Sequence, residues 1–140
     1  MARKPRIAIV DGSNVAHSTE GAAPRLANIA IMRDKLIEKG FQPVLVVDAA
    51  LRHQIDDRAG YEKMVDAGEV KQAPAGTDAD YFILSFAREL GARVVSNDRF
   101  RDRMHEFKDL SRRFIRYMIV ADEVVFEQRN GKRPGRSRGG

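Results

Sequence analysis

The chain has 140 residues, of which 43% are hydrophobic and 32% are charged, and it carries a net charge of +5. This length suits one domain with a substantial core, and this composition is typical of a globular protein. No apolar run approaches the roughly 18 residues of a transmembrane helix, and the N-terminus lacks the apolar segment of a signal peptide. The absence of cysteine excludes disulfides, thiolate zinc sites and a cysteine nucleophile. We therefore expect a cytoplasmic protein without a membrane partner.

Basic residues are concentrated at the two ends of the chain. Residues 1–6 carry three basic groups and residues 129–140 carry five, whereas the rest has 17 basic and 20 acidic residues. We predict a basic N-terminal arm at 1–5, a folded domain at 6–127 and a disordered basic tail at 128–140. Basic ends attract polyanions, although a solubilising or artificially added tail would have the same composition.

The first half of the chain predicts two buried strands that each end in a carboxylate. Residues 6–10 are almost wholly apolar and lead into Asp11, and residues 41–48 repeat this pattern. Such runs are typical of central strands in a parallel sheet. Between them, residues 24–39 have apolar side chains at helical spacing, and Gly40 suits the position that closes a helix.

Strands and helices continue to alternate in the second half, which favours a three-layer α/β/α sandwich with a mostly parallel central sheet. Thr77 is predicted to cap a helix that runs to Leu90, and a strand at 93–96 follows. After Asp98 we expect a short basic helix that ends near Leu110. The other expected elements are a turn at 12–14 with a loop up to Pro24, a helix at about 53–66, a brief strand at 70–73, and two strands at 114–120 and 123–126 that form a hairpin.

Acidic residues follow several of the predicted strands. Asp11, Asp48 and Asp98 lie at the carboxyl ends of strands, where open parallel sheets bind ligands. Asp80 lies in the first turn of a helix that follows a strand, and Asp102 lies one helical turn after Asp98. Several carboxylates in one cleft are unfavourable unless cations neutralise them, and oxygen ligands with retained water suit magnesium or manganese better than zinc. The sequence therefore predicts a divalent-metal site.

Each of these acids also has a purely structural explanation. Thr77 and Asp80 resemble a capping box in which Asp replaces the usual Glu. Asp98 could cap the helix that follows, Asp102 could pair with a neighbouring arginine, and Asp11 could belong to a turn. Because all these acids are predicted to lie at one edge of the sheet, a metal site is favoured over these separate structural explanations.

The remaining polar residues give weaker signals. Asn14 follows Asp11 closely, but it could simply bond to the loop backbone. The three histidines are not spaced as a metal-binding set. Ser13 has no recognisable histidine partner, so a hydrolase triad is not predicted.

Three segments carry the strongest family signal: IVDGSNVA at 9–16, DYFIL at 80–84, and VVSND at 94–98 followed by Asp102. Together they resemble the NYN/PIN-like ribonucleases, in particular the Regnase-type branch, over about residues 6–126. The resemblance implies magnesium ligands at Asp11, Asp80, Asp98 and Asp102 and a supporting role for Asn14.

Two departures from the Regnase pattern stand out. That pattern has adjacent acids before the aromatic residue, whereas Ala79 separates Asp78 from Asp80 here. We leave open whether Asp78 or Asp48 joins the site. The family's CCCH zinc finger requires cysteines, which this chain lacks, and the basic tail could replace its role in holding RNA.

The sequence predicts a metal-dependent endoribonuclease that hydrolyses phosphodiester bonds in single-stranded or loop RNA, with Mg²⁺ or alternatively Mn²⁺ as cofactor. The alternative is a catalytically inactive PIN-like module that binds RNA. A phosphatase or receiver-like protein is disfavoured, because Asp11-Gly12-Ser13 lacks the required Asp-x-Asp pattern. We leave open a homodimer. Contacts to the RNA backbone are predicted at Arg52, Arg99, Arg101, Arg112 and Arg113.

Overall fold

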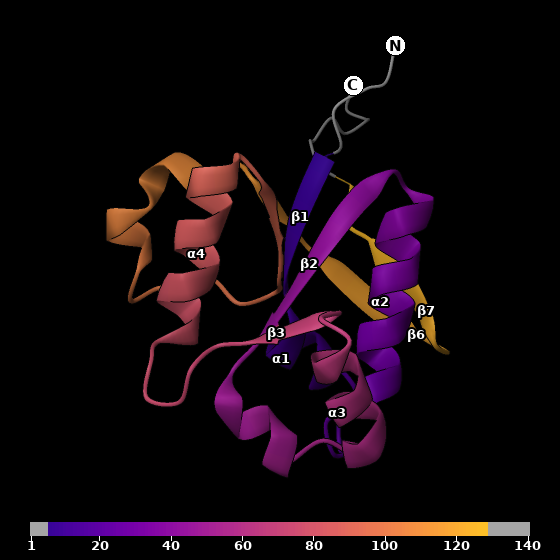
Figure 1. Cartoon of the computed structure of the whole chain (residues 1–140). Coiled ribbons are helices and arrows are strands. Elements are labelled where there is room, and N and C mark those ends of the chain that lie inside the picture. Colours follow the sequence, from indigo (N-terminus) through magenta and orange to yellow (C-terminus); the bar gives the residue numbers. More distant parts are fainter. Residues whose placement is uncertain (1–5, 129–140) are drawn as a thin grey trace.

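The computed structural model describes residues 6–128 as a sheet between two layers (Figure 1). Five parallel strands form the sheet in the order β3-β2-β1-β4-β5. This architecture confirms the predicted α/β/α sandwich with a mostly parallel sheet. The strands are β1 (Arg6–Asp11), β2 (Phe41–Val47), β3 (Val70–Gln72), β4 (Arg93–Val95) and β5 (Phe114–Ile115).

The two faces of the sheet are covered by different elements. One face packs against α1, α2, α3 and a separate two-stranded hairpin, and the other packs against α4 and the segment that follows β4. The helices are α1 (Gly12–Ala16), α2 (Leu26–Glu38), α3 (Arg58–Asp66) and α4 (Ala79–Leu90), with 3₁₀ turns η1 (Ala49–His53), η2 (Met104–Glu106) and η3 (Lys108–Leu110); the hairpin strands are β6 (Tyr117–Val120) and β7 (Glu123–Phe126).

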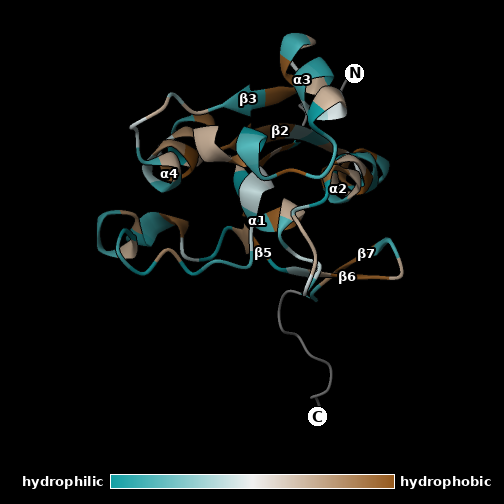
Figure 2. Cartoon of the chain, turned by 90° about the horizontal axis from the view of Figure 1, so that it is seen from below, coloured by the Kyte–Doolittle hydropathy of each residue, from teal (hydrophilic) through white to brown (hydrophobic). Residues whose placement is uncertain are grey.

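The central strand β1 is buried on both sides of the sheet. Ala8 and Val10 join the core on the α2 side, whereas Ile9 joins the core on the α4 side, and none of the three is exposed. This division follows from the alternation of side chains along a strand. Figure 2 shows the hydrophobic residues of β2 between α2 and α4. The continuous apolar run of β1 therefore predicts its central place correctly.

The strand order reverses direction at β1. The chain passes from β1 to β2 and β3 on one side, and β4 and β5 are added on the other side. In open parallel sheets such a reversal leaves a crevice at the carboxyl ends of the two central strands. Because Val10 pairs with Val95, the crevice lies between Asp11 and Ser96.

The predicted turn at 12–14 is instead the short helix α1. The Asp11 side chain caps it by accepting a hydrogen bond from the Asn14 backbone N–H, so the helix starts directly at the end of β1. Gly12 allows α1 to lie close to β2, since a Cβ at this position would lie 2.6 Å from Val47 Cγ1. The loop that follows runs over 17–25, because α2 begins at Leu26 and not at Pro24.

The other boundaries differ from the predictions for local reasons. Asp78, not Thr77, caps α4 through the backbone N–H groups of Asp80 and Tyr81. The expected helix at 53–66 begins only at Arg58, as α3, because Asp57 caps it through the Gly60 backbone N–H, and the 3₁₀ turn η1 precedes it at Ala49–His53.

The expected helix after Asp98 is wrong, because this segment forms turns and the two 3₁₀ turns η2 and η3. Phe100 adopts a positive φ of 50°, and its buried ring stacks on Phe114 at 5.8 Å between centroids. This burial turns the chain inward where a helix would have to continue. Asp102 is therefore not one helical turn away from Asp98.

The expected strand at 114–120 breaks at Arg116. Its first part joins the central sheet as β5, whereas its second part pairs with β7 in the predicted hairpin. Ala121 and Asp122 form the hairpin turn with φ values of 51° and 62°, as a two-residue turn of this twist requires. The predicted basic arm at 1–5 and residues 129–140 of the predicted tail lie outside the described residues. Within residues 6–128, no helix is long and apolar enough to span a bilayer.

Candidate active site

Asp11 is the buried acid at the switch point of the sheet, with 7% of its surface exposed. Its Oδ2 accepts a hydrogen bond from Ser96 Oγ at 2.8 Å, and its Oδ1 accepts one from the Asn14 backbone N–H at 3.3 Å. Burial raises the pKa of Asp11 to about 6, and the charges of Asp80 and Asp98 act in the same direction, whereas the two hydrogen bonds oppose them. Asp11 is thus held rigidly in a place where its negative charge is costly.

Asp98 lies at the end of the neighbouring strand but is exposed to solvent. Its backbone N–H donates to Ser96 Oγ at 3.0 Å, and its Oδ1 accepts from the Phe100 backbone N–H at 2.7 Å. Ser96, which is fully buried, therefore connects the Asp11 carboxylate to the backbone of Asp98. Ser96 lies in the VVSND motif, but no sequence pattern indicated its role at the site.

Asp80 reaches the same region from the first turn of α4. It is half-buried, and burial raises its pKa, with further increases from the charges of Asp98, Asp78 and Asp48. Three predicted ligands, on three separate elements, thus lie within electrostatic range of one another. Such an accumulation of negative charge suits a bound cation, which would offset it.

The acids are near one another without forming a tight cluster. Within residues 6–128, no group of three or more acidic or histidine side chains is arranged closely enough to hold a metal ion directly. Magnesium and manganese ions usually keep part of their water shell, so such an ion does not need direct contact with every acid of its site. The type of ion stays a prediction.

Three further acids occupy different positions around the site. Asp48 caps η1 by accepting from the Leu51 backbone N–H at 3.0 Å. Asp78 forms an ion pair with Arg103, which lowers the pKa of Asp78. Asp102, a predicted ligand, is exposed in the turn after Phe100.

Asn14 is fixed by a polar network that joins three segments. Its Oδ1 accepts from the Asn97 backbone N–H at 3.0 Å and from the Tyr117 hydroxyl at 2.7 Å. The Tyr117 hydroxyl also bonds to Ser18 Oγ at 2.8 Å, and burial raises the pKa of Tyr117 to about 12. Tyr117 therefore remains a neutral donor that helps to fix the Asn14 amide, and the supporting role of Asn14 at the site stays a prediction.

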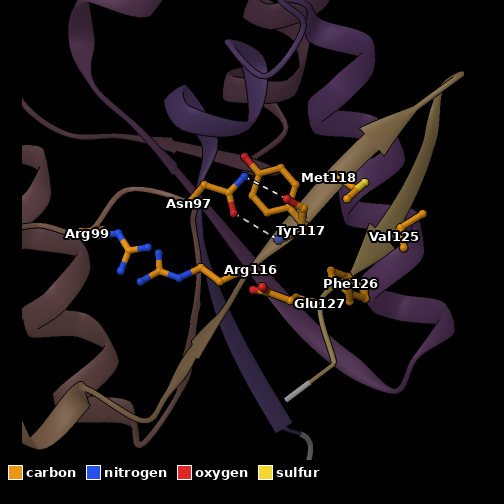
Figure 3. Close-up of a pocket in the computed structure, with 8 residues that line it drawn as sticks. All are labelled: Asn97, Arg99, Arg116, Tyr117, Met118, Val125, Phe126 and Glu127. Atoms are coloured by element: carbon orange, nitrogen blue, oxygen red, sulfur yellow. Dashed lines mark hydrogen bonds between the residues drawn. The ribbon is translucent and has the colours of Figure 1, made fainter. Parts of the chain in front are cut away.

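Asn97 ties the hairpin to the end of β4. Its side-chain amide donates to the Tyr117 carbonyl at 2.9 Å, and its Oδ1 accepts from the Tyr117 backbone N–H at 3.1 Å (Figure 3). No sequence signal pointed to Tyr117, because it is separated from Asn14 by 103 positions. The contact forms because the chain leaves the central sheet after β5 and enters the hairpin strand β6, which starts at Tyr117.

The predicted RNA-contacting arginines lie on several surfaces. Arg52 forms an ion pair with Glu62 at 2.6 Å, so its positive charge is partly neutralised by this carboxylate. Arg116 was not among the predicted residues, and its Nη1 donates hydrogen bonds to the Ser96 and Asp98 carbonyls at 2.7 Å each. The other predicted residues are Arg99 and Arg101, both exposed after Asp98, and Arg112 and Arg113, which precede β5.

Comparisons with known proteins agree with this architecture. Residues 4–138 match the family model described as "Zc3h12a-like Ribonuclease NYN domain". Two structures of nuclear protein-only RNase P 2 from Arabidopsis thaliana share the fold: one has 22% identity and a TM-score of 0.71 over 89% of this chain, and the other has 23% identity and a TM-score of 0.68 over 86%. The matches cover 30% and 29% of those chains. No curated protein matches this chain.

Proposed function

Because the chain belongs to the family of Zc3h12a-like ribonuclease NYN domains, we propose that it is a metal-dependent endoribonuclease acting on single-stranded or loop RNA. The observation that carries this proposal is the arrangement at the switch point. Ser96 links buried Asp11 to exposed Asp98, and Asp80 approaches from α4. One rigid acid and two more accessible acids thus lie at the carboxyl ends of the strands, where open parallel sheets bind their ligands.

The proposed cofactor is Mg²⁺, with Mn²⁺ as the alternative. Asp11, Asp80 and Asp98 would hold one or two ions, and Asp102 would contribute from the adjacent turn. When bound, such an ion stabilises negative charge on the phosphate and makes water a better nucleophile. It would also compensate the repulsion that raises the pKa of Asp11 and Asp80.

The remaining residues position these acids. Ser96 fixes the orientation of Asp11, and Asn14 holds the end of β4 through Asn97. Water attacks the phosphorus in line with the bond to the 3′ oxygen, and breaking that bond leaves 5′-phosphate and 3′-hydroxyl ends, as the resemblance implies. The acids must be positioned accurately, because a misplacement of about 1 Å can lower the rate of hydrolysis about a hundredfold.

The test is cleavage of a labelled single-stranded RNA with Mg²⁺, with EDTA, and by Asp98→Asn. Both the chelator and the substitution are expected to reduce cleavage on the order of a thousandfold or more, because the ion stabilises most of the developing charge. Asp34→Asn, an exposed acid on α2, is the matched control and retains activity.

Two results would contradict the proposal. Cleavage that survives both EDTA and Asp98→Asn would exclude the metal site as its cause. RNA binding without turnover in either Mg²⁺ or Mn²⁺ would instead identify the alternative function, an inactive RNA-binding module.

A further inference from the structure

A pocket of about 480 Å³ lies between the turn after β4 and the hairpin, and Asn97 and Arg99, which flank Asp98 in the chain, line it (Figure 3). Its two ends differ in chemistry. One end has the guanidinium groups of Arg99 and Arg116, which point toward one another, and the other end is apolar. The apolar end is lined by Met118, Val125 and Phe126, and the Glu127 side chain also lines the pocket, between Arg116 and Phe126 (Figure 3).

The cationic end has two like charges close together. Burial lowers the pKa of Arg116, and the charge of Arg99 lowers it further, although the charges of Glu127 and Asp98 oppose this. Neither arginine forms an ion pair within residues 6–128, and Arg99 has no hydrogen-bond partner there either. Two neighbouring guanidinium groups that form no ion pair can donate hydrogen bonds to a phosphate group.

The apolar end is an uncovered part of the hairpin. Met118 and Val125 are directly opposite one another on β6 and β7, and they are 58% and 48% exposed. Covering this exposed apolar pair with a ligand would be favourable, because apolar surface would leave water. Its surface suits the face of a nucleobase, which every base presents irrespective of sequence.

The pocket is joined to the acid site by short contacts. Arg116 Nη1 bonds to the Asp98 carbonyl at 2.7 Å, and Asn97 lines the pocket while its backbone N–H bonds to Asn14. A strand of RNA lying in the pocket would therefore continue onto Asp98. The cationic end suits the phosphate of one nucleotide, and the apolar end suits its base.

We propose that this pocket binds the nucleotide adjacent to the scissile phosphate, with its own phosphate on Arg99 and Arg116 and its base on Met118 and Val125. This assignment rests on the proposed ribonuclease function, because it places RNA at the acids. It extends that function by naming a subsite that grips single-stranded RNA without reading its sequence.

The cationic end is tested with Arg99→Ala, because Arg116 also supports the backbone at Asp98. Binding of a fluorescent single-stranded RNA is measured by anisotropy in EDTA over a salt series, so that no cleavage occurs. Arg99→Ala is expected to weaken binding about tenfold at low salt and to reduce the slope of log K against log salt by about 0.7, as for one lost phosphate contact. Lys71→Ala on β3, at the opposite edge of the sheet, is the charge-matched control and binds as the wild type does.

The apolar end is tested with the double variant Met118→Ser and Val125→Ser. It is expected to weaken binding of the RNA about fivefold, while an oligonucleotide that lacks the bases binds the variant and the wild type equally. Val120→Ser is the control, because Val120 is an exposed hairpin residue that does not line the pocket. Circular dichroism melting confirms that each variant is folded.

The outcomes separate this inference from the proposed function. Cleavage by the wild type, with Arg99→Ala and the double variant binding RNA normally, would overturn the subsite alone. Weaker binding by both variants, without any cleavage by the wild type, would support the subsite and contradict the nuclease. A double variant that changes only the sedimentation coefficient would overturn the base-binding end and show that the hairpin joins two copies of the chain.

Discussion

The ends of β1 and β4 lie next to each other in the sheet but hold their carboxylates in different ways. Asp11 is buried and accepts two hydrogen bonds, so its charge is destabilised and its position is fixed. Asp98 is exposed, and one backbone N–H orients it. Both depend on Ser96, which donates to the first and accepts from the backbone of the second.

This difference indicates a division of roles at the site. The buried acid gives a rigid reference point at the cost of stability, which is common at functional sites. The charge of the exposed acid Asp98 costs the folded protein little stability, and its carboxylate remains accessible to solvent and substrate. Substitutions of the two should therefore reduce activity alike but change stability differently.

The largest expected effect comes from Asp11→Asn. Cleavage should fall on the order of a thousandfold, as for Asp98→Asn, because both are proposed to hold the ion. Stability in EDTA should nevertheless rise at pH 7, by up to about 3 kcal/mol, since a pKa raised from 3.8 to about 6 corresponds to that cost of a buried charge. The measurement is urea unfolding of the wild type and both variants.

The pH dependence gives the direction of this effect. The folded protein binds the Asp11 proton more tightly than the unfolded chain, so wild-type stability should decrease as the pH rises from about 4 to about 6 and then level off. The advantage of Asp11→Asn should disappear near pH 4. A variant that is less stable than the wild type at pH 7 would contradict the assigned cost of the Asp11 charge.

An intermediate effect is expected from Tyr117→Phe, which tests the network that supports the two strand ends. Loss of the hydroxyl removes the bonds to Asn14 and Ser18. Unfolding free energy should decrease by about 1 kcal/mol, and cleavage should fall about tenfold because Asn14 loses one of two anchors. Tyr81→Phe is the control, since the exposed Tyr81 hydroxyl makes no hydrogen bond within residues 6–128. An equal loss of stability in both variants would indicate that the network is unimportant.

The smallest effect is expected from Asp102→Asn. Asp102 is exposed in a turn rather than aligned with Asp98 on a helix, so cleavage should fall by about tenfold or less, the scale of a supporting group. The activity is measured over a range of Mg²⁺ concentrations beside that of Asp98→Asn. A loss as large as that of Asp98→Asn would show that the turn rearranges to bring Asp102 to the ion.

Local sequence patterns predicted the strands correctly where a continuous run of apolar residues is buried in the sheet. The apolar run before Asp11 and the run before Asp48 correspond to β1 and β2, and the acid at each strand end is in the expected place. The segment after Asp98 was mispredicted as a helix. Its irregular path depends on the stacking of Phe100 on Phe114, a contact that local spacing does not contain.

The sequence by itself determined the alternation of strands and helices and the acids at the strand ends, because these follow from the periodicity of apolar residues and the chain direction. Only the tertiary structure decided which side chains complete the site. Ser96, Tyr117 and Arg116 take part because β4, β5 and the hairpin meet beside β1, far from it in the chain. The physical reason is that burial and hydrogen bonding arise from neighbours in space, whereas a sequence pattern reports only neighbours along the chain.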